Sequence, residues 1–321
     1  MQIKAIAYLG IGSTAPLEWL KYGTDVLGMM PARAIPGMGW GFPGVPRAAS
    51  EQTGIAADGS VYLKMDDRQW RIAVHPHAKN GALLYIGMEF EGPEAYAQGL
   101  HELQHAGIAV TYGTEAEAGA RAVTALARIQ DPCGLVIELF YGHTCDYNFQ
   151  SPYIEHQFVA GCLGFGHLIL FLTKQAECFH FYTEMLGFRL TDYIKFGPAS
   201  RLQFLRCNAR HHSLAMVDLG GVTGIQHLLV EVTDIDAVGR TLDRAKKAGF
   251  NVVSAMGRHR NDRMLSFYMR GPGGFDVEVG CDGRLVDESW RANEFCEGDV
   301  WGHDGIVDAL QNAVKEMMQQ Q

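Results

Sequence analysis

The sequence has 321 residues, 47% hydrophobic and 20% charged, which is an ordinary globular composition and enough chain for two domains. Its formal net charge of −9 argues against a nucleic-acid partner, because phosphate binding needs a basic surface, and against adsorption to an anionic membrane. We find no run of roughly 20 apolar residues that could span a bilayer and no basic, cleavable leader. Seven scattered cysteines are typical of reduced thiols, so we expect a cytoplasmic protein.

The chain opens on an apolar segment, and a long irregular segment follows. Residues 1–12 read MQIKAIAYLGIG, a pattern that predicts a first β-strand. Residues 34–60 are rich in glycine and proline and predict a long loop. This loop carries Trp40 and Phe42. Two interpretations stay open: the loop is an interface or lid, or it is a plain surface excursion.

The most informative feature is an internal repeat, because repeats define the units of a fold. Residues 83–111 and 225–253 overlay without a gap. In each copy an apolar strand leads into an amphipathic helix, and the helix ends at an Ala-Gly pair, residues 106–107 and 248–249. Such a glycine is a common C-terminal signal of a helix. A short apolar run then predicts another strand.

Three further pairs of segments repeat in the same order. They are 27–29 with 186–188, 68–73 with 210–215, and 131–138 with 271–278. Each half of the chain therefore divides into two units in which strands alternate with one helix. This pattern predicts an α+β protein of four βαβββ units, arranged as two domains that are each a half-open curved sheet with helices outside.

The predicted N-terminal domain is 1–147 and includes the loop 34–60. Residues 148–162 are predicted to link it to a C-terminal domain, 163–321. Near the end of the second domain, apolar residues between 306 and 318 lie on one helical face, which predicts a helix that docks on the body of the protein.

Three side chains in the C-terminal half are of types that bind metals. His167 and His227 lie early in two apolar segments and Glu278 lies in a third, so each comes from a different predicted strand. Two imidazoles and one carboxylate are the facial ligand set of non-haem iron(II), which leaves coordination positions open as a catalytic metal requires. Ligands without a thiolate favour iron(II) or manganese(II) over a structural zinc. Taken singly, each residue is more often a hydrogen-bonded core or surface residue.

The N-terminal half provides an internal comparison for these three positions. Its counterparts are Tyr8, Tyr85 and Glu138, so two of the three ligands are missing there. The N-terminal half therefore cannot build the same site. The C-terminal half has all three ligand types at equivalent positions of its repeat units. This arrangement favours a metal site over three unrelated structural residues.

Further polar side chains follow the ligand positions. His212 stands where the N-terminal repeat has Trp70, His259 precedes a predicted strand, and Tyr268 lies within that strand. Histidine exchanges a proton near neutral pH, and tyrosine can donate a hydrogen bond to a hydroxyl. Without the predicted ligands, His259 would be interpreted as a solvated loop residue and Tyr268 as a core aromatic.

These motifs resemble those of the type I extradiol catechol dioxygenases of the vicinal oxygen chelate superfamily, and in particular the 2,3-dihydroxybiphenyl 1,2-dioxygenases. The matching segments are 164–167, 207–212, 227–232 and 257–278, with similar segments at 68–74, 131–142 and 301–303. The family signature runs from His259 through Tyr268 and Pro272 to Glu278. The sequence departs from the family at Gly271 and in the long insertion 34–60, which leaves the substrate and the subunit packing open.

The resemblance implies an iron(II) ion at the three predicted ligands, with manganese(II) as the less favoured metal. It implies that His212 is the acid-base residue beside the dioxygen site and that His259 and Tyr268 contact the substrate hydroxyls. The implied substrate pocket includes four further residues, Ile169, Phe204, Asn261 and Asp262.

The implied reaction inserts both atoms of dioxygen into a catechol, next to the diol, during degradation of aromatic compounds. Bulky pocket residues suit a substituted or bicyclic catechol such as 2,3-dihydroxybiphenyl, while naphthalene-like and alkyl catechols stay open. Two alternatives are a glyoxalase-like isomerase of the same fold and a metal-free aromatic-binding protein. Such isomerases usually have four ligands split between two units, and the tyrosines at the N-terminal ligand positions count against that reading. We also expect a homo-oligomer.

Overall fold

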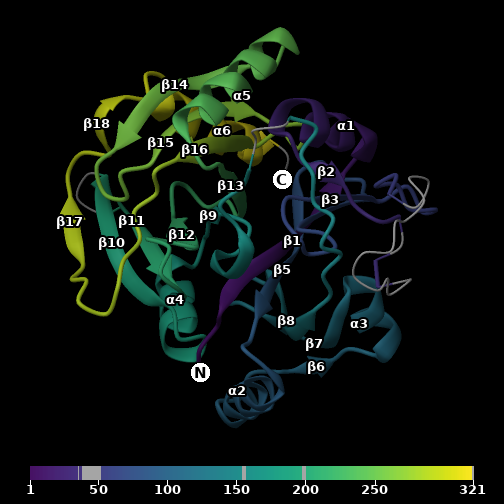
Figure 1. Ribbon diagram of the computed structural model, residues 1–321. Coiled ribbons are helices and arrows are strands. Elements are labelled where there is room, and N and C mark those ends of the chain that lie inside the picture. Colours follow the sequence, from purple (N-terminus) through teal and green to yellow (C-terminus); the bar gives the residue numbers. More distant parts are fainter. Residues whose placement is uncertain (35, 38–51, 154–156, 197–199, 320–321) are drawn as a thin grey trace.

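The first half of the chain forms an 8-stranded sheet from two successive βαβββ units (Figure 1). The computed structural model describes residues 1–34, 36–37, 52–153, 157–196 and 200–319. The first unit consists of β1 (Ala5–Ser13), α1 (Pro16–Lys21), a π-helical turn (Tyr22–Leu27), β2 (Met30–Pro31), β3 (Val61–Lys64) and β4 (Ile72–Pro76). The second consists of β5 (Ala82–Glu89), α2 (Pro93–His105), β6 (Thr111–Tyr112), α3 (Glu115–Arg121), β7 (Val123–Gln130) and β8 (Val136–His143). The strand order is β2-β3-β4-β1-β5-β8-β7-β6.

The second half forms a 10-stranded sheet from two further units and two added strands. After a 3₁₀ turn (Gly161–Leu163), the third unit consists of β9 (His167–Phe171), α4 (Gln175–His180), a π-helical turn (Phe181–Met185), β10 (Arg189–Phe196), β11 (Ser200–Arg206) and β12 (Leu214–Val217). The fourth consists of β13 (Gly224–Glu231), α5 (Ile235–Lys247), β14 (Val252–His259), β15 (Leu265–Arg270) and β16 (Asp276–Cys281). The chain ends with β17 (Asn293–Phe295), β18 (Asp299–Gly302) and α6 (Ile306–Gln319). The strand order is β17-β10-β11-β12-β9-β13-β16-β15-β14-β18.

The predicted fold class, an α+β protein of four βαβββ units in two sheets, is confirmed. The sequence pattern did not predict β17 and β18, which pair with β10 and β14 at the two edges of the C-terminal sheet. Both strands are short and lack the apolar alternation that marks a strand in sequence. The domain limits 1–147 and 163–321 stay a prediction.

The glycines predicted to end the helices have the required backbone conformation. Gly107 follows α2 with φ 81° and Gly249 follows α5 with φ 80°, both in the left-handed region that glycine tolerates without strain. The repeated Gly28 and Gly187 have φ 79° and 73°. The repeat in sequence is therefore also a repeat in backbone geometry.

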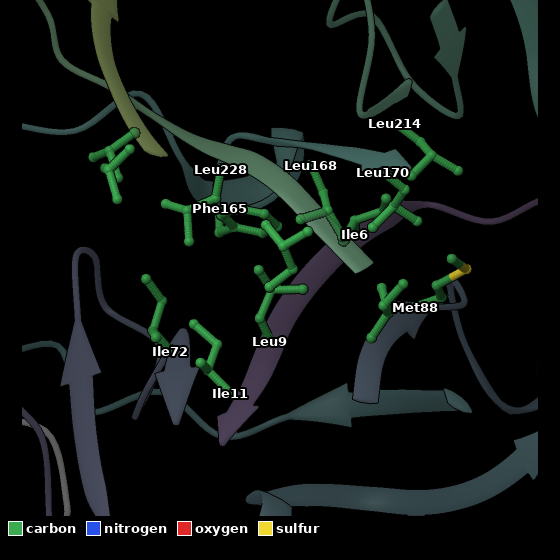
Figure 2. Close-up of a cluster of buried hydrophobic side chains, with 14 of the residues drawn as sticks. Ile6, Leu9, Ile11, Ile72, Met88, Phe165, Leu168, Leu170, Leu214 and Leu228 are labelled. Atoms are coloured by element: carbon green, nitrogen blue, oxygen red, sulfur yellow. The ribbon is translucent and has the colours of Figure 1, made fainter. Parts of the chain in front are cut away.

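The two sheets share one hydrophobic core. Ile6, Leu9 and Ile11 of β1 belong to the same buried cluster as Leu168 and Leu170 of β9, and Figure 2 shows these side chains meeting between the sheets. Successive side chains of a strand point to opposite faces. The residues that alternate with the two leucines of β9, which include the predicted ligand His167, therefore face away from this core.

Helix α6 docks on the C-terminal sheet as the sequence predicted. Ala309 and Ala313 are buried, and Ala313 belongs to a cluster with Phe171 and Val217 against which Met317 packs. Most of the predicted loop 34–60 (residues 35 and 38–51) and part of the predicted linker (residues 154–156) lie outside the described residues. No helix in the described ranges combines the length and apolar character needed to cross a membrane.

Candidate active site

Three adjacent strands of the C-terminal sheet carry the predicted ligands. Strand β13 lies between the other two and pairs antiparallel with β9 and parallel with β16. Leu229 of β13 is opposite both His167 and Glu278 in the register. A register shift follows Ile225, directly before His227, and such bulges commonly re-aim a side chain beside an active site.

The three ligand atoms form a nearly equilateral triangle. The Nε2 atoms of His167 and His227 lie 3.1 Å apart, and Oε2 of Glu278 lies 3.1 Å from the first and 3.2 Å from the second. Metal–ligand bonds of about 2.1 Å at right angles place donor atoms ~3.0 Å apart. The triangle therefore fits one face of an octahedral metal site, with the opposite face left for other ligands.

The charge of Glu278 also fits a bound cation. Burial raises the pKa of this carboxyl, but hydrogen bonds with His167, His227 and His259 outweigh burial and hold the pKa well below its usual range. Its second oxygen, Oε1, is buried and has only a long contact of 3.5 Å with Nε2 of His259 among the described residues. A buried ionised carboxylate that is not fully hydrogen-bonded is costly unless a positive charge accompanies it.

The counterpart of this site in the N-terminal sheet is filled by side chains. The Tyr8 hydroxyl donates to Oε2 of Glu138 at 2.9 Å, and Nε of Arg121 donates to the same oxygen at 2.8 Å. The guanidinium of Arg121 also lies over the Tyr85 ring, 4.1 Å from its centroid, while Trp70 packs against Tyr8 at 4.5 Å between ring centroids. Arg128 also donates to Oε1 of Glu138 at 3.1 Å, so two arginines supply the positive charge beside the N-terminal glutamate.

His212 lies next to the predicted ligands, between β11 and β12. Its buried ring stacks on that of His167 with 4.1 Å between centroids. Its Nδ1 is 3.1 Å from Nδ1 of His211, and Nε2 of His211 donates to Asp192 at 2.7 Å. In a neutral pair, Nδ1 of His211 is then the acceptor and Nδ1 of His212 the donor. This chain leaves Nε2 of His212 free to accept a proton.

The pKa of His212 is consistent with a base. Burial, followed by the neighbouring charge of His167, holds the pKa of His212 well below its usual range. The imidazole is therefore neutral at neutral pH and can take up a proton when negative charge develops beside it.

His259 and Tyr268 lie beside two of the predicted ligands, His259 next to Glu278 and Tyr268 next to His227. Nε2 of His259 is 2.8 Å from the Tyr268 hydroxyl and 3.5 Å from Oε1 of Glu278, while its Nδ1 is 2.7 Å from Oδ1 of Asp299. Burial lowers the pKa of His259, but hydrogen bonds to Asp299 and Glu278 outweigh burial and raise it to about 10. Burial also raises the pKa of Tyr268 well above its usual value. Both groups are therefore hydrogen-bond donors at neutral pH.

A cavity of about 180 Å³ connects these groups. All ten residues predicted from the sequence line this cavity: His167, Ile169, Phe204, His212, His227, His259, Asn261, Asp262, Tyr268 and Glu278. One wall is apolar and includes Ile194, Leu202 and Leu310 beside the predicted pocket residues. Other lining groups are polar, and the buried Nδ2 of Asn261 has no hydrogen-bond partner among the described residues. The cavity therefore has room for an aromatic ring with one polar edge.

Several cavity and supporting residues were not assigned by the sequence analysis. Asp299 and Leu310 line the cavity, and Asp192 holds His211 behind it. The sequence offers no signal for the carboxylates, because an isolated aspartate in a polar segment is usually a surface residue. Only the resemblance at residues 301–303 marked the neighbourhood of Asp299.

Comparisons with known proteins agree with this geometry. A profile of the Glyoxalase/Bleomycin resistance protein/Dioxygenase superfamily matches residues 164–279, the segment that contains all three predicted ligands. The iron-dependent extradiol dioxygenase of Rhodococcus jostii (strain RHA1) is 37% identical over 319 residues, covering 96% of this chain and 99% of that protein. The biphenyl-2,3-diol 1,2-dioxygenase of Paraburkholderia xenovorans (strain LB400) is 34% identical, covering 96% and 97%.

Solved structures show the same fold. A crystal structure of BphC, a halotolerant catechol dioxygenase, matches with a TM-score of 0.85 at 31% identity and covers 96% of this chain and 97% of that one. The Mn(II)-bound glyoxalase from Novosphingobium aromaticivorans has a TM-score of 0.72 at 20% identity, which shows a shared fold alone. With relatives above 30% identity over nearly the whole length, the chain belongs to the extradiol dioxygenase family of the glyoxalase/dioxygenase superfamily.

Proposed function

We propose that this protein uses iron(II) to cleave a substituted catechol next to its diol, with both oxygen atoms of dioxygen entering the product. The observation that carries this proposal is the triangle of ligand atoms with edges of 3.1, 3.1 and 3.2 Å at one end of the cavity. Manganese(II) is the alternative metal, since it accepts the same nitrogen and oxygen ligands.

His167, His227 and Glu278 would hold the metal through Nε2, Nε2 and Oε2. Bound there, the ion supplies a Lewis-acidic, redox-active centre with open positions for the two catechol oxygens and dioxygen. Nδ1 of His227 contacts Oε1 of the neighbouring Gln226, which orients the imidazole so that Nε2 points to the metal position. Such a partner behind a ligand histidine fixes its tautomer.

His212 would act as the proton-transfer residue. Its Nε2 is the nitrogen left free by the His211 contact, and its ring lies against the ring of a ligand histidine. A neutral imidazole there can accept a proton from the substrate side and return it when the ring opens. Because the side chain is buried, this charge change occurs away from bulk water, where its effect on the reaction is larger.

His259 and Tyr268 would bind the hydroxyl oxygens of the catechol. Nε2 of His259 donates to the Tyr268 hydroxyl oxygen at 2.8 Å, which leaves the hydroxyl hydrogen for the substrate, and both groups flank Glu278. Donors held in place before the substrate arrives stabilise the negative charge that develops on the diol oxygens as their protons leave. Asn261 and Asp262 line the same cavity and would orient the ring.

The apolar wall would select the ring substituent. Ile169, Ile194 and Phe204 form one buried cluster and line the cavity with Leu310 of α6. An apolar substituent on the catechol would displace water from this wall, which favours binding by about 25 cal/mol per Å² of apolar surface buried. We therefore propose an aryl- or alkyl-substituted catechol as the substrate. We also propose that the enzyme is a cytoplasmic homo-oligomer.

The test is anaerobic reconstitution of the apoprotein with iron(II), or with manganese(II) in parallel. Each sample then meets a panel of catechols that includes 2,3-dihydroxybiphenyl, 1,2-dihydroxynaphthalene, 3-methylcatechol and catechol. Oxygen uptake with a matching amount of yellow ring-cleaved product supports the proposal. Absence of oxygen uptake with every vicinal diol overturns it, and activity only with manganese(II) overturns the choice of metal.

A further inference from the structure

A carboxylate outside the metal ligands holds the ring of His259. Oδ1 of Asp299 lies 2.7 Å from Nδ1 of His259 and 2.6 Å from Nδ1 of His303. Burial raises the pKa of Asp299, but hydrogen bonds from the two histidines outweigh burial and lower it to about 2. An ionised carboxylate can only accept hydrogen bonds. Both Nδ1 atoms therefore carry hydrogen.

His303 supports the same ring from its other side. The rings of His259 and His303 lie 4.1 Å apart between centroids with an interplanar angle of 32°. Nε2 of His303 lies 3.1 Å from both the hydroxyl and the carbonyl oxygen of Ser266. His303 is thus fixed at both nitrogens, and its buried ring limits how far His259 can move.

The backbone is shaped to bring these residues together. His303 has φ 57°, a left-handed conformation that is unfavourable for residues with a side chain. A Cβ atom on Gly257 would lie 2.4 Å from the backbone nitrogen of His303, and one on Gly302 would lie 2.3 Å from the carbonyl oxygen of Met256. Two glycines therefore make the close approach of His303 to β14 possible.

The edge strand sets the pairing of the two residues. Strand β18 pairs antiparallel with β14, and a register shift after Arg258 places Asp299 opposite His259. Local strain that the surrounding structure holds in place is common at functional sites. Here the strained residue is His303, which directly follows β18, and β18 pairs with His259 of the cavity wall.

We propose that Asp299, supported by His303, is a positioning residue that accepts the hydrogen bond from Nδ1 of His259 and so keeps Nε2 of this ring directed at the Tyr268 hydroxyl and the substrate. The inference rests on the proposed function, in which His259 binds a catechol oxygen. Without the carboxylate, the ring loses the acceptor of its Nδ1–H and can turn about χ2, so Nε2 no longer meets the substrate in one defined orientation.

A double-mutant cycle tests whether Asp299 acts through His259. Asp299→Ala is expected to lower kcat about 10- to 100-fold, with KM changed less than about 3-fold and iron content per chain unchanged. In a His259→Ala background, the same substitution is expected to change kcat less than about 2-fold, because the residue that Asp299 positions is gone. Asp299→Asn keeps an acceptor oxygen and is expected to retain more activity than Asp299→Ala.

A second readout does not need activity. In apoprotein labelled with ¹⁵N-histidine, the hydrogen-bonded Nδ1–H proton of His259 is expected at low field, assigned by its loss in His259→Ala. The resonance should disappear in Asp299→Ala. Glu89→Gln is the matched control, since Oε1 of Glu89 lies 2.8 Å from Nδ1 of His143 in the N-terminal sheet. This substitution should leave the His259 resonance in place and change kcat less than about 2-fold.

Equal loss of kcat from Asp299→Ala in both backgrounds overturns the inference, because it means that Asp299 acts independently of His259. Persistence of the His259 Nδ1–H resonance in Asp299→Ala also overturns it. If the wild-type protein cleaves no vicinal diol, the proposed function fails. The resonance then still decides whether Asp299 holds the Nδ1–H of His259 in a hydrogen bond.

Discussion

Nε2 of His167 lies 3.1 Å from Oε2 of Glu278, although 111 residues separate them in the sequence. The pairing of β13 with both β9 and β16 creates this contact, because Leu229 is the common partner of both residues. The ligand geometry is therefore a property of the sheet register. A substitution that keeps the register but changes a ligand atom should affect metal binding with little effect on folding.

Glu278→Gln should abolish stoichiometric iron binding. The amide has the shape of the carboxylate but lacks its charge. We therefore expect the affinity for iron(II) to fall at least about 100-fold, which is more than the loss of a residue that only hydrogen-bonds to a metal ligand costs. Iron per chain after anaerobic reconstitution and desalting is the measurement. Glu138→Gln, the same change at the counterpart position in the N-terminal sheet, is the control and should keep one iron per chain. Full iron retention by Glu278→Gln would contradict the ligand assignment.

His212→Phe should separate catalysis from metal binding. The ring that packs on His167 is replaced by another ring, while the three ligand atoms stay in place. We expect kcat per bound iron to fall about 10²- to 10⁴-fold, the usual contribution of a general acid-base residue. His180→Asn, on the exposed face of α4, should have no effect. A loss of iron in proportion to the loss of activity would show that His212 supports the metal instead.

Ile194→Phe should narrow the cavity at its apolar wall, so that the variant discriminates between substrates by size. Ile194 is buried and lines the cavity, so a larger side chain occupies space needed by a ring substituent. We expect kcat/KM for 2,3-dihydroxybiphenyl to fall about 10-fold or more relative to unsubstituted catechol, the scale of a steric mismatch in an apolar pocket. Ile55→Phe, at a half-exposed position away from the cavity, should leave the ratio unchanged. An equal loss for both catechols would argue that the substituent does not occupy this wall.

Glu89 should make folding stability depend on pH. Burial raises the pKa of its carboxyl, but hydrogen bonds and charge from His143 and Arg68 outweigh burial and lower the pKa to about 2 from its usual 4.5. Because the folded pKa is the lower one, the stabilisation is complete above pH ~4.5 and is lost as the pH falls toward ~2. The shift corresponds to about 3 kcal/mol at most.

Urea denaturation of the apoprotein between pH 6 and pH 3 measures this effect. Glu89→Gln should lower the free energy of unfolding at pH 6, and the difference from wild type should shrink as the pH falls through 4.5. Glu91→Gln, whose carboxylate is exposed and makes a surface ion pair with Lys4, should differ little from wild type at any pH. A constant difference between wild type and Glu89→Gln across this range would rule out the pKa shift as the cause.

The sequence alone determined the fold class of this protein and predicted the three side chains that the structure brings together as a candidate metal site. The helix-ending glycines and the period of the apolar residues are local signals, and the repeat aligned them into four units. Comparison of the halves then separated His167 and His227 from Tyr8 and Tyr85. These signals can be detected in the sequence because the spacing of apolar residues in each strand and each helix marks the face that is buried.

The tertiary structure decided how the site is supported. Asp299 reaches His259 through a short edge strand with a register shift, and Asp192 reaches His212 through His211. Leu310 joins the cavity wall because α6 docks across the sheet. None of these contacts has a periodic signature, since each depends on which strand edges and side-chain atoms meet in space. The two sheets also share one core, through contacts between strands that are far apart in the sequence. The apolar pattern within a single strand cannot specify which strands meet.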